Sequence, residues 1–377
     1  MRILFDTQIF LLQKYGGISR YYSEILRFIF KEKNIEVEFP LYITDNFHLL
    51  NYKLGQAKFI RLVQNYISGR FKNYLLQKSV SATEKYLKSG EFDVFVPTYY
   101  DSNFLRFIGN TPFVLTVYDM IHENYPQLEK ESSIISDKKL LIESANKIIA
   151  ISHSTKNDIL KLYPHINEEK IDVVYLSHSI EKAKVGEQVI QNVVGKSNYI
   201  LFVGNRSFYK NFKLILPIVS EWLKKNDIKL LCLGGGSLTN EEAILISEFG
   251  LSKYVVQYTF KDHELFSFYN RAFAFIFPSE YEGFGIPVLE SMYSSCPVLL
   301  PRLTSFPEVA GEAGEYFNLE NDNSLLEALD RICFNLEYRD ELIQKGLKQA
   351  EKFSWEKTFN ECLEIYKSVG SHKRLSV

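Results

Sequence analysis

The chain has few cysteines and no pattern among them that indicates a known use. The 377 residues include four, Cys232, Cys296, Cys333 and Cys362. None has Cys-x-x-Cys spacing or a partnering histidine, which argues against a disulfide framework and against a zinc site. We therefore expect a protein of the reducing cytoplasm.

The chain also lacks a charge excess and a long apolar run. Lys and Arg number 44 against 46 Asp and Glu, a net charge of −2, whereas nucleic-acid-binding proteins usually carry a basic excess. No run reaches the roughly eighteen apolar residues of a membrane span. The opening segment 1–5 fits a first strand better than a signal peptide. We expect neither a nucleic-acid binder nor a secreted or membrane-spanning protein.

Two kinds of cofactor motif are missing as well. The chain has no Asp-x-Asp pair, so the sequence requires no bound magnesium. Gly16-Gly17 lies too far from the first strand for a dinucleotide fingerprint, and 234–236 lacks the third spaced glycine. A nicotinamide enzyme is thus disfavoured, and each glycine cluster alone also fits a simple turn.

What is present indicates two α/β domains. The length suits about two domains, and the 46% hydrophobic content suffices for a core in each. Apolar strands alternate with helical patterns, as in doubly wound parallel sheets. We predict strands near 2–5, 35–43, 93–96, 112–118, 147–151, 171–175, 199–204, 228–234, 254–258, 272–277 and 297–300. The polar stretch 181–197 places the boundary between domains 1–185 and 186–353.

The segment 278–290 joins a buried strand to a helix through glycines and carries two carboxylates, Glu282 and Glu290. Pro287 fits the first helical position, so we expect unpaired backbone N–H groups over 285–289 at the end of the strand. Such groups bind anions, and a phosphorylated sugar fits between the carboxylates. The alternative is a glycine-permitted turn whose carboxylate favours the helix dipole.

A cationic pair follows the strand predicted near 199–204. Arg206 and Lys210 lie four residues apart after Gly204, entering the next helix. An Arg fork with a Lys ammonium can stabilise a departing nucleotide diphosphate without a metal. The alternative is a basic pair on a helix surface.

In the N-terminal half, Gly16 and Gly17 precede an amphipathic helix through Ile29 and let a backbone approach a phosphate or sugar. Asp119 follows another buried strand, where its carboxylate could accept hydrogen bonds from the hydroxyls of a ligand. His122 is a further candidate, although a lone histidine there is equally well structural.

These motifs together resemble the retaining glycosyltransferases of group 1 and family 4, which have the GT-B fold of two Rossmann-like domains. The resemblance is carried by the segments 116–122, 199–211, 282–290, 305–311 and 353–357. Its nearest branch is that of bacterial O-antigen-type mannosyltransferases. Many relatives place a histidine where Tyr118 stands, so Tyr118 could replace only its hydrogen bonding.

The resemblance implies an N-terminal acceptor-binding domain, a C-terminal donor-binding domain, and a last helix within 354–377 that crosses back to the first domain. It implies a nucleotide-sugar co-substrate, with GDP-mannose our first choice, and no other cofactor. The implied catalytic residues are Glu282, Arg206, Lys210 and Asp119. The implied donor-binding residues are Glu290, Gly283, Phe284, Gly285, Ile286, Val288, Leu289, Gly16, Gly17, Gly204, Thr259, Phe260, Tyr118 and His122.

The stretch 58–88 is basic, with aromatic residues at helical spacing. Such a helix can lie on an anionic membrane, which suits a lipid-linked oligosaccharide acceptor at the inner leaflet, or it can simply be solvated. Other donors (UDP- or dTDP-sugars), a nucleotide-sugar epimerase and a catalytically silent binding subunit remain alternatives. The sequence leaves the sugar, acceptor, linkage and oligomeric state open.

Overall fold

The computed structural model describes residues 1–52, 69–128, 133–183, 185–206 and 208–375. The chain forms two compact units. Unit 1 comprises Met1–Leu176 with Trp355–Val377, and unit 2 comprises Ser177–Ser354. In the described part of the chain, no helix has both the length and the apolar character needed to cross a membrane. All four cysteines are free and buried.

In its described residues, unit 1 has six parallel strands in two three-stranded sheets. The first has the order β2 (Glu36–Glu38), β1 (Arg2–Phe5), β3 (Val94–Val96), and the second the order β4 (Val114–Val117), β5 (Lys147–Ala150), β6 (Ile171–Val173). A single parallel bridge between Phe95 and Phe113 joins β3 to the segment before β4. The strand order therefore reverses between β1 and β3.

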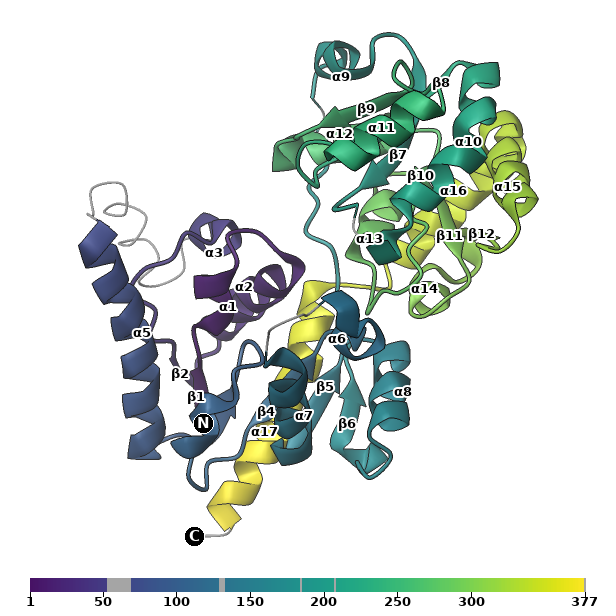
Figure 1. Cartoon of the computed structure of the whole chain (residues 1–377). Helices are drawn as coiled ribbons and strands as arrows, with labels where there is room; N and C mark the ends of the chain where they lie inside the picture. Colours follow the sequence, from purple (N-terminus) through teal and green to yellow (C-terminus); the bar gives the residue numbers. More distant parts are fainter. Residues whose placement is uncertain (53–68, 129–132, 184, 207, 376–377) are drawn as a thin grey trace. The chain divides into compact units, whose positions relative to one another are not determined.

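The helices of unit 1 include the last one of the chain. They are α1 (Gln8–Leu12), α2 (Gly17–Ile29), α3 (Phe47–Asn51), α5 (Gly69–Ser89), α6 (Ile121–Asn124), α7 (Ile134–Ser144), α8 (His153–Leu162) and α17 (Trp355–Leu375), seen in Figure 1. Phe359 on α17 stacks on Phe28 of α2, with 5.4 Å between centroids. Tyr366 meets Phe5 of β1 edge to face. Burial of these rings ties the C-terminal helix to the first sheet.

The part of unit 2 that the structure describes has a six-stranded parallel sheet. Its order is β12 (Gly314–Phe317), β11 (Val298–Pro301), β10 (Phe275–Ile276), β7 (Asn198–Val203), β8 (Ile228–Leu233), β9 (Val255–Tyr258). In chain order this is 6-5-4-1-2-3, the strand order of the dinucleotide-binding Rossmann fold. The order reverses between β7 and β10, whose ends carry the segments singled out in the sequence.

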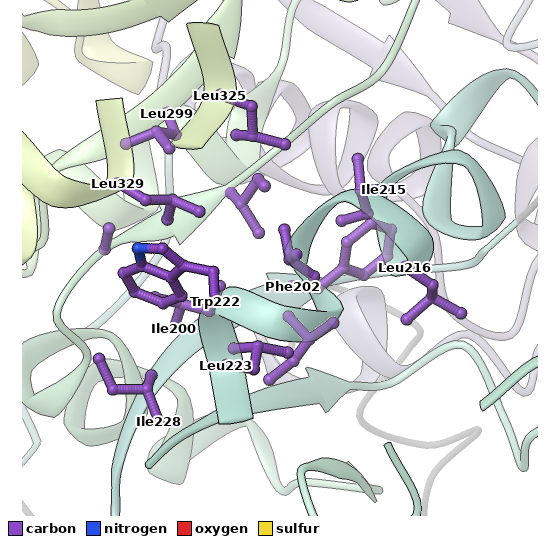
Figure 2. Packing of buried hydrophobic residues seen from close by; sticks show 14 of the residues in the cluster. Ile200, Phe202, Ile215, Leu216, Trp222, Leu223, Ile228, Leu299, Leu325 and Leu329 are labelled. Atoms are coloured by element: carbon purple, nitrogen blue, oxygen red, sulfur yellow. The ribbon is translucent and has the colours of Figure 1, made fainter. Parts of the chain in front are cut away.

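The apolar runs of unit 2 are explained by helices on both faces of the sheet. The helices are α9 (Glu187–Val194), α10 (Phe212–Asn226), α11 (Asn240–Glu248), α12 (Leu265–Arg271), α13 (Ile286–Tyr293), α14 (Phe306–Ala310), α15 (Asp322–Phe334) and α16 (Leu336–Ala350). Figure 2 shows Trp222 of α10 between Leu329 of α15 and Ile200 of β7. The indole N–H of Trp222 donates to Asp330 Oδ1 at 2.7 Å, which satisfies its polar atom in the core.

The predicted fold class, two Rossmann-like α/β domains, is confirmed. The structure divides the chain at 176/177, nine residues before the predicted boundary at 185/186. His178 stacks on Tyr293 of α13 with 4.2 Å between centroids, and the N–H of Val185 donates to Ser267 Oγ at 2.9 Å. These contacts hold His178 and Val185 to unit 2. The sequence analysis also missed β12.

Candidate functional site

The candidate site of unit 2 lies at the carboxyl ends of β7 and β10. Neighbouring strands whose connections leave in opposite directions expose a crevice there, which is where ligands bind in open parallel sheets. The loop after β7 supplies Gly204, Arg206 and Lys210, and the loop after β10 supplies 278–285. Gly204 has φ 106°, a conformation that only glycine adopts readily.

The two loops are tied to each other by three contacts. The Lys210 ammonium forms an ion pair with the Glu282 carboxylate, and both side chains are about six-sevenths buried, at 13% and 15% exposure. The N–H of Glu280 donates to the Tyr209 carbonyl at 2.8 Å, and Asn211 Nδ2 donates to the Pro278 carbonyl at 3.1 Å. A cation and a carboxylate are thereby fixed at the strand reversal.

Ser305, at the start of α14, shapes the loop that holds Glu282. Its fully buried hydroxyl lies 3.0 Å from the carbonyl of Glu282 and 2.9 Å from that of Phe284, so both acceptors share one O–H. The Phe284 ring is buried against Phe353, 5.9 Å between centroids. Gly285 then turns the chain with φ 96°. The side chain of Phe284 therefore anchors the loop in the core.

Helix α13 brings Glu290 to the same end of the sheet, where it is 5% exposed. The expectation of unpaired N–H groups throughout 285–289 needs a correction. Pro287 is the second helical residue and has no N–H, and the N–H of Val288 donates to the Gly285 carbonyl at 2.9 Å. The side chains of Val288 and Leu289 are fully buried in the core of unit 2. Any ligand contact by these two residues would have to come from their backbone.

Arg206 is directed away from the Lys210–Glu282 pair and into the protein. Its side chain is 2% exposed, and Nε donates to Glu242 Oε1 at 2.9 Å. The remaining guanidinium donors reach the carbonyl oxygens of a turn after β8 at 2.9 to 3.4 Å, namely those of Gly234, Gly235, Gly236 and Ser237. The guanidinium is thus committed to holding this turn.

The turn needs its glycines. Gly234, Gly235 and Gly236 have φ of 74°, 69° and 74° in succession, so their carbonyls can converge on one cation. A Cβ on Gly235 would lie 2.4 Å from the Gly204 carbonyl oxygen, closer than atoms can approach. Phe260, after β9, packs beside Gly234, and the neighbouring Thr259 is exposed. Phe260, one of the implied donor-binding residues, therefore adjoins the glycine turn.

In unit 1, Tyr118 is buried among other tyrosines. Its ring meets those of Tyr21, Tyr22 and Tyr100 at 5.9, 6.4 and 6.2 Å between centroids. Burial raises the pKa of the Tyr118 phenol well above its ordinary value, which keeps it neutral. The structure places this side chain in the core of unit 1, where the residue is 5% exposed.

Asp119 and His122 follow β4 and are held by a residue that was not predicted, Lys138 of α7. The Lys138 side chain is fully buried, and Nζ donates to Glu123 Oε2 at 2.8 Å and to the Asp119 carbonyl at 3.2 Å. It also lies 3.4 Å from His122 Nδ1, which can accept only in the tautomer protonated at Nε2. Asp119 Oδ1 accepts from the N–H of Ile121.

Gly16 and Gly17 lie at the start of α2, and Gly16 is extended, with φ 170°. The predicted helix through Ile29 is the observed one. A side chain at Gly16 would meet Gln13 Oε1, which accepts a hydrogen bond from the N–H of Ser19 at 3.3 Å. The close approach here is therefore to Gln13.

Sequence reasoning missed Ser305, Glu242 and Lys138. Ser305 is the first residue of the segment 305–311, which carries part of the resemblance. Nothing in the sequence, however, indicates that its hydroxyl bonds two carbonyl groups of the loop that holds Glu282. Glu242 stands three residues after Thr239, a spacing that predicts a capping box. The sequence does not indicate that the second carboxylate oxygen of Glu242 binds Arg206. Within the described ranges, no group of three His, Cys, Asp or Glu is arranged to hold a metal.

The strand orders of the two units define a protein of two Rossmann-like α/β domains. A model of the glycosyl transferases group 1 matches residues 186–349, and a model of glycosyltransferase family 4 matches residues 15–179. The chain belongs to this family of glycosyltransferases and is an enzyme of that class.

Curated relatives of modest sequence identity are also glycosyltransferases. The chain is 25% identical to O-antigen chain mannosyltransferase B of Escherichia coli over 67% of its own length and 70% of the relative's. It is 27% identical to O-antigen chain mannosyltransferase RfbU of Salmonella typhimurium strain LT2 over 52% and 53% of the two chains. The match to the serotype-specific mannosyltransferase WbdA of Escherichia coli is 33% identical, over 64% of this chain and 32% of WbdA.

Solved structures share the fold over nearly the whole chain. Sucrose-phosphate synthase from Thermosynechococcus elongatus has a TM-score of 0.74 at 17% identity, covering 98% of this chain and 99% of that one. WaaG, a glycosyltransferase involved in lipopolysaccharide biosynthesis, has a TM-score of 0.67 at 14% identity, covering 97% and 99%. At these identities the likeness establishes the GT-B fold alone.

Proposed function

We propose that the protein is a retaining, metal-independent hexosyltransferase that transfers mannose from GDP-mannose to a hydroxyl of a glycan or lipid-linked oligosaccharide. The product would be part of a bacterial surface polysaccharide. The names of the matched relatives, O-antigen chain mannosyltransferases, support the sugar and the process. The observation that carries the proposal is the Lys210–Glu282 ion pair at the strand reversal of unit 2.

When a donor binds, Lys210 and Glu282 would each exchange the other for a better partner on the donor. The diphosphate accepts from the Lys210 ammonium, and Glu282 accepts from hydroxyls of the sugar. Glu290, buried one turn into α13, would accept from the ribose hydroxyls, as the family resemblance implies. Backbone groups of 283–286 would complete the contact with the sugar and diphosphate.

Lys210 is then the cation that stabilises the diphosphate as the glycosidic bond breaks. The bond from the anomeric carbon to the phosphate oxygen breaks, a bond to the acceptor oxygen forms on the same face, and the leaving phosphate takes the acceptor's proton. We assign Arg206 a positioning role, because its donors are bound to Glu242 and the glycine turn. Neither Glu282 nor Glu290 has to act as a nucleophile.

Unit 1 would supply the acceptor side. Asp119 is held at the end of β4 by a backbone hydrogen bond and can accept from a sugar hydroxyl. With Nδ1 accepting from Lys138, His122 would carry its proton on Nε2 and could donate to the donor sugar. Gly16 and Gly17 open α2, where a phosphate can approach.

We further propose that the enzyme acts at the cytoplasmic face of a membrane through the segment 58–88, of which 58–68 lie outside the described residues. One face of α5 in unit 1 presents four exposed cations and two exposed aromatic rings, with no acidic residue among them. They are Arg70, Lys78, Lys85, Lys88, Phe71 and Tyr74. Such a face suits anionic lipid headgroups.

Calorimetric titration tests the donor. The protein is titrated with GDP-mannose, UDP-N-acetylglucosamine, UDP-glucose and dTDP-rhamnose, with Glu290→Ala as the site variant and Glu248→Ala, exposed on α11, as its control. We expect selective binding of GDP-mannose that Glu290→Ala weakens about tenfold or more and that Glu248→Ala leaves unchanged. Preference for another donor would replace mannose and keep the mechanism, whereas absence of binding to every donor would favour a silent subunit.

A further inference from the structure

The hydroxyl of Ser279 is a buried polar group in the loop after β10, and the proposed function gives it no role. Ser279 is fully buried and lies three residues before Glu282. Among the residues that the structure describes, its Oγ has no hydrogen-bond partner. A hydroxyl has one donor and two acceptor sites, and leaving all of them unused inside a protein costs free energy. Such groups are rare in folded proteins, and functional sites are one of the places where they occur.

Two hydrogen bonds place Ser279 next to Lys210. The carbonyl of the preceding residue accepts from Asn211 Nδ2 at 3.1 Å, and the N–H of the following residue donates to the Tyr209 carbonyl at 2.8 Å. These bonds bracket Ser279 in one loop and Lys210 in the other. The two residues therefore lie beside each other where the loops meet.

The Lys210 ammonium is directed to the same part of the loop. Its Nζ lies 4.9 Å from the centroid of the ring of Phe277, which stands two residues before Ser279 and is also buried. Among the described residues, the carboxylate of Glu282 is the hydrogen-bond acceptor of this ammonium. An ammonium has three donors, so it can hold a further acceptor besides the carboxylate.

Binding of a donor, as proposed above, changes the surroundings of this ammonium. Glu282 then accepts from the sugar hydroxyls and Lys210 donates to the diphosphate, so the ammonium loses the protein acceptor that fixes it. A lysine has a flexible four-carbon stem, and its position is poorly defined when phosphate oxygens alone hold its charge. A neutral oxygen beside the stem can fix the ammonium without competing with the phosphate for that charge.

We propose that Ser279 is a positioning residue for Lys210. When the donor separates Lys210 from Glu282, the Ser279 hydroxyl accepts a hydrogen bond from Nζ and directs the ammonium at the diphosphate. This role rests on the proposed function, because it requires a bound diphosphate, but it requires neither mannose nor transfer. A nucleoside diphosphate without its sugar carries the full charge of the leaving group, so its binding should depend most on this contact.

Calorimetric titration of the full chain with GDP and with UDP tests the proposal. The proteins are the wild type, Ser279→Ala, Lys210→Met and the double variant. Ser294→Ala is the matched control, because Ser294, at the end of α13, is also fully buried and its hydroxyl has no partner among the described residues. Urea unfolding of each protein measures its stability.

We expect Ser279→Ala to weaken the binding of at least one diphosphate about three- to tenfold, the usual contribution of one hydrogen bond, and Ser294→Ala to leave it unchanged. Lys210→Met should still bind measurably through Glu290 and the backbone of 283–286. In that background the effect of Ser279→Ala should disappear, which a merely structural role of Ser279 would not produce. Both serine variants should be at least as stable as the wild type, since each loses only an unpartnered hydroxyl.

The proposal is overturned if Ser279→Ala binds both diphosphates as tightly as the wild type, or if the loss is the same with and without Lys210. It is also overturned if the wild type binds neither diphosphate, or if Ser279→Ala alone is less stable than the wild type, because its hydroxyl would then already have a structural partner. The donor titration described above tests the proposed function separately. Preference for a UDP-sugar there would replace mannose and leave the role of Ser279 intact.

Discussion

Arg206 and Glu242 form a buried ion pair between the loop after β7 and the first turn of α11, with 2.9 Å between Nε and Oε1 and side-chain exposures of 2% and 3%. The other oxygen of Glu242 accepts from the N–H of Thr239 and caps α11. One carboxylate therefore joins a helix cap to the cation that holds the glycine turn.

Arg206→Met should destabilise the protein by about 3 to 5 kcal/mol, because it leaves the Glu242 carboxylate buried without a counter-charge. Glu242→Gln in the same chain should recover part of the loss, since it removes that charge. Urea unfolding of the two single variants and the double variant measures the coupling. Lys224→Met, which breaks the exposed pair with Glu221, is the control and should cost less than about 1 kcal/mol. If Arg206→Met lowers the free energy of unfolding by less than about 1 kcal/mol, Arg206 is not structural and is better assigned as a phosphate ligand.

Lys210→Met should lower turnover by about 10² to 10³, because its ammonium is the cation assigned to the departing diphosphate. Donor affinity should change much less, since the interaction strengthens as the glycosidic bond breaks. Nucleotide release from GDP-mannose, with acceptor or by slow hydrolysis, gives kcat and KM. Lys213→Met removes a half-exposed lysine of α10 that pairs with Glu241, and it should leave both values unchanged. Equal turnover in the two variants would contradict the assignment.

Asp6 should make stability depend on pH. Burial raises the pKa of its carboxyl from 3.8 to about 6, against the hydrogen bonds from Thr98 and Gln8 and with some help from Asp101. Because the folded value is the higher one, the stabilisation is complete below about pH 4 and is lost as pH rises through about 6. The variant Asp6→Asn does not titrate, so its free energy of unfolding relative to wild type should increase by about 2 kcal/mol between roughly pH 4.5 and 7.5.

Urea unfolding at these two pH values measures the difference, with the exposed Asp340→Asn as control. If the difference in free energy of unfolding between wild type and Asp6→Asn is the same at both pH values, the pKa of the Asp6 carboxyl is not raised by folding.

The cationic face of α5 should bind anionic vesicles. Replacing Arg70, Lys78, Lys85 and Lys88 by Gln should reduce cosedimentation with phosphatidylglycerol-containing vesicles at least about tenfold, since each cation near such a surface contributes about 1 kcal/mol. A control with equal charge loss replaces the exposed Lys33, Lys139, Lys161 and Lys348. Pure phosphatidylcholine vesicles should bind neither protein. Unchanged cosedimentation of the α5 variant would contradict the membrane proposal.

Local patterns predicted most of the fold. Each predicted strand position contains an observed strand. Two observed strands are shorter than predicted, since 35–43 contains only Glu36–Glu38 and 272–277 contains only Phe275–Ile276. β12 was missed because it is a short edge strand whose Glu315 pairs with Arg331 of α15, so its apolar signal is weak. The positions of the glycines, the two glutamates and Lys210 at strand ends and helix starts could be predicted, because loop conformation and helix ends depend on neighbouring residues.

The sequence by itself determined the class of fold and the strand ends that carry Glu282 and Lys210. These follow from the alternation of apolar runs with helices and from glycines that only particular turns require. The family was indicated separately, by the resemblance of its motifs. Tertiary structure alone decided that Arg206 holds a turn, that Tyr118 is buried, that Lys138 supports His122 and that Ser279 lies beside Lys210. The physical reason is that the partners of a charge, and the space around it, come from segments distant in the chain, which no local pattern records.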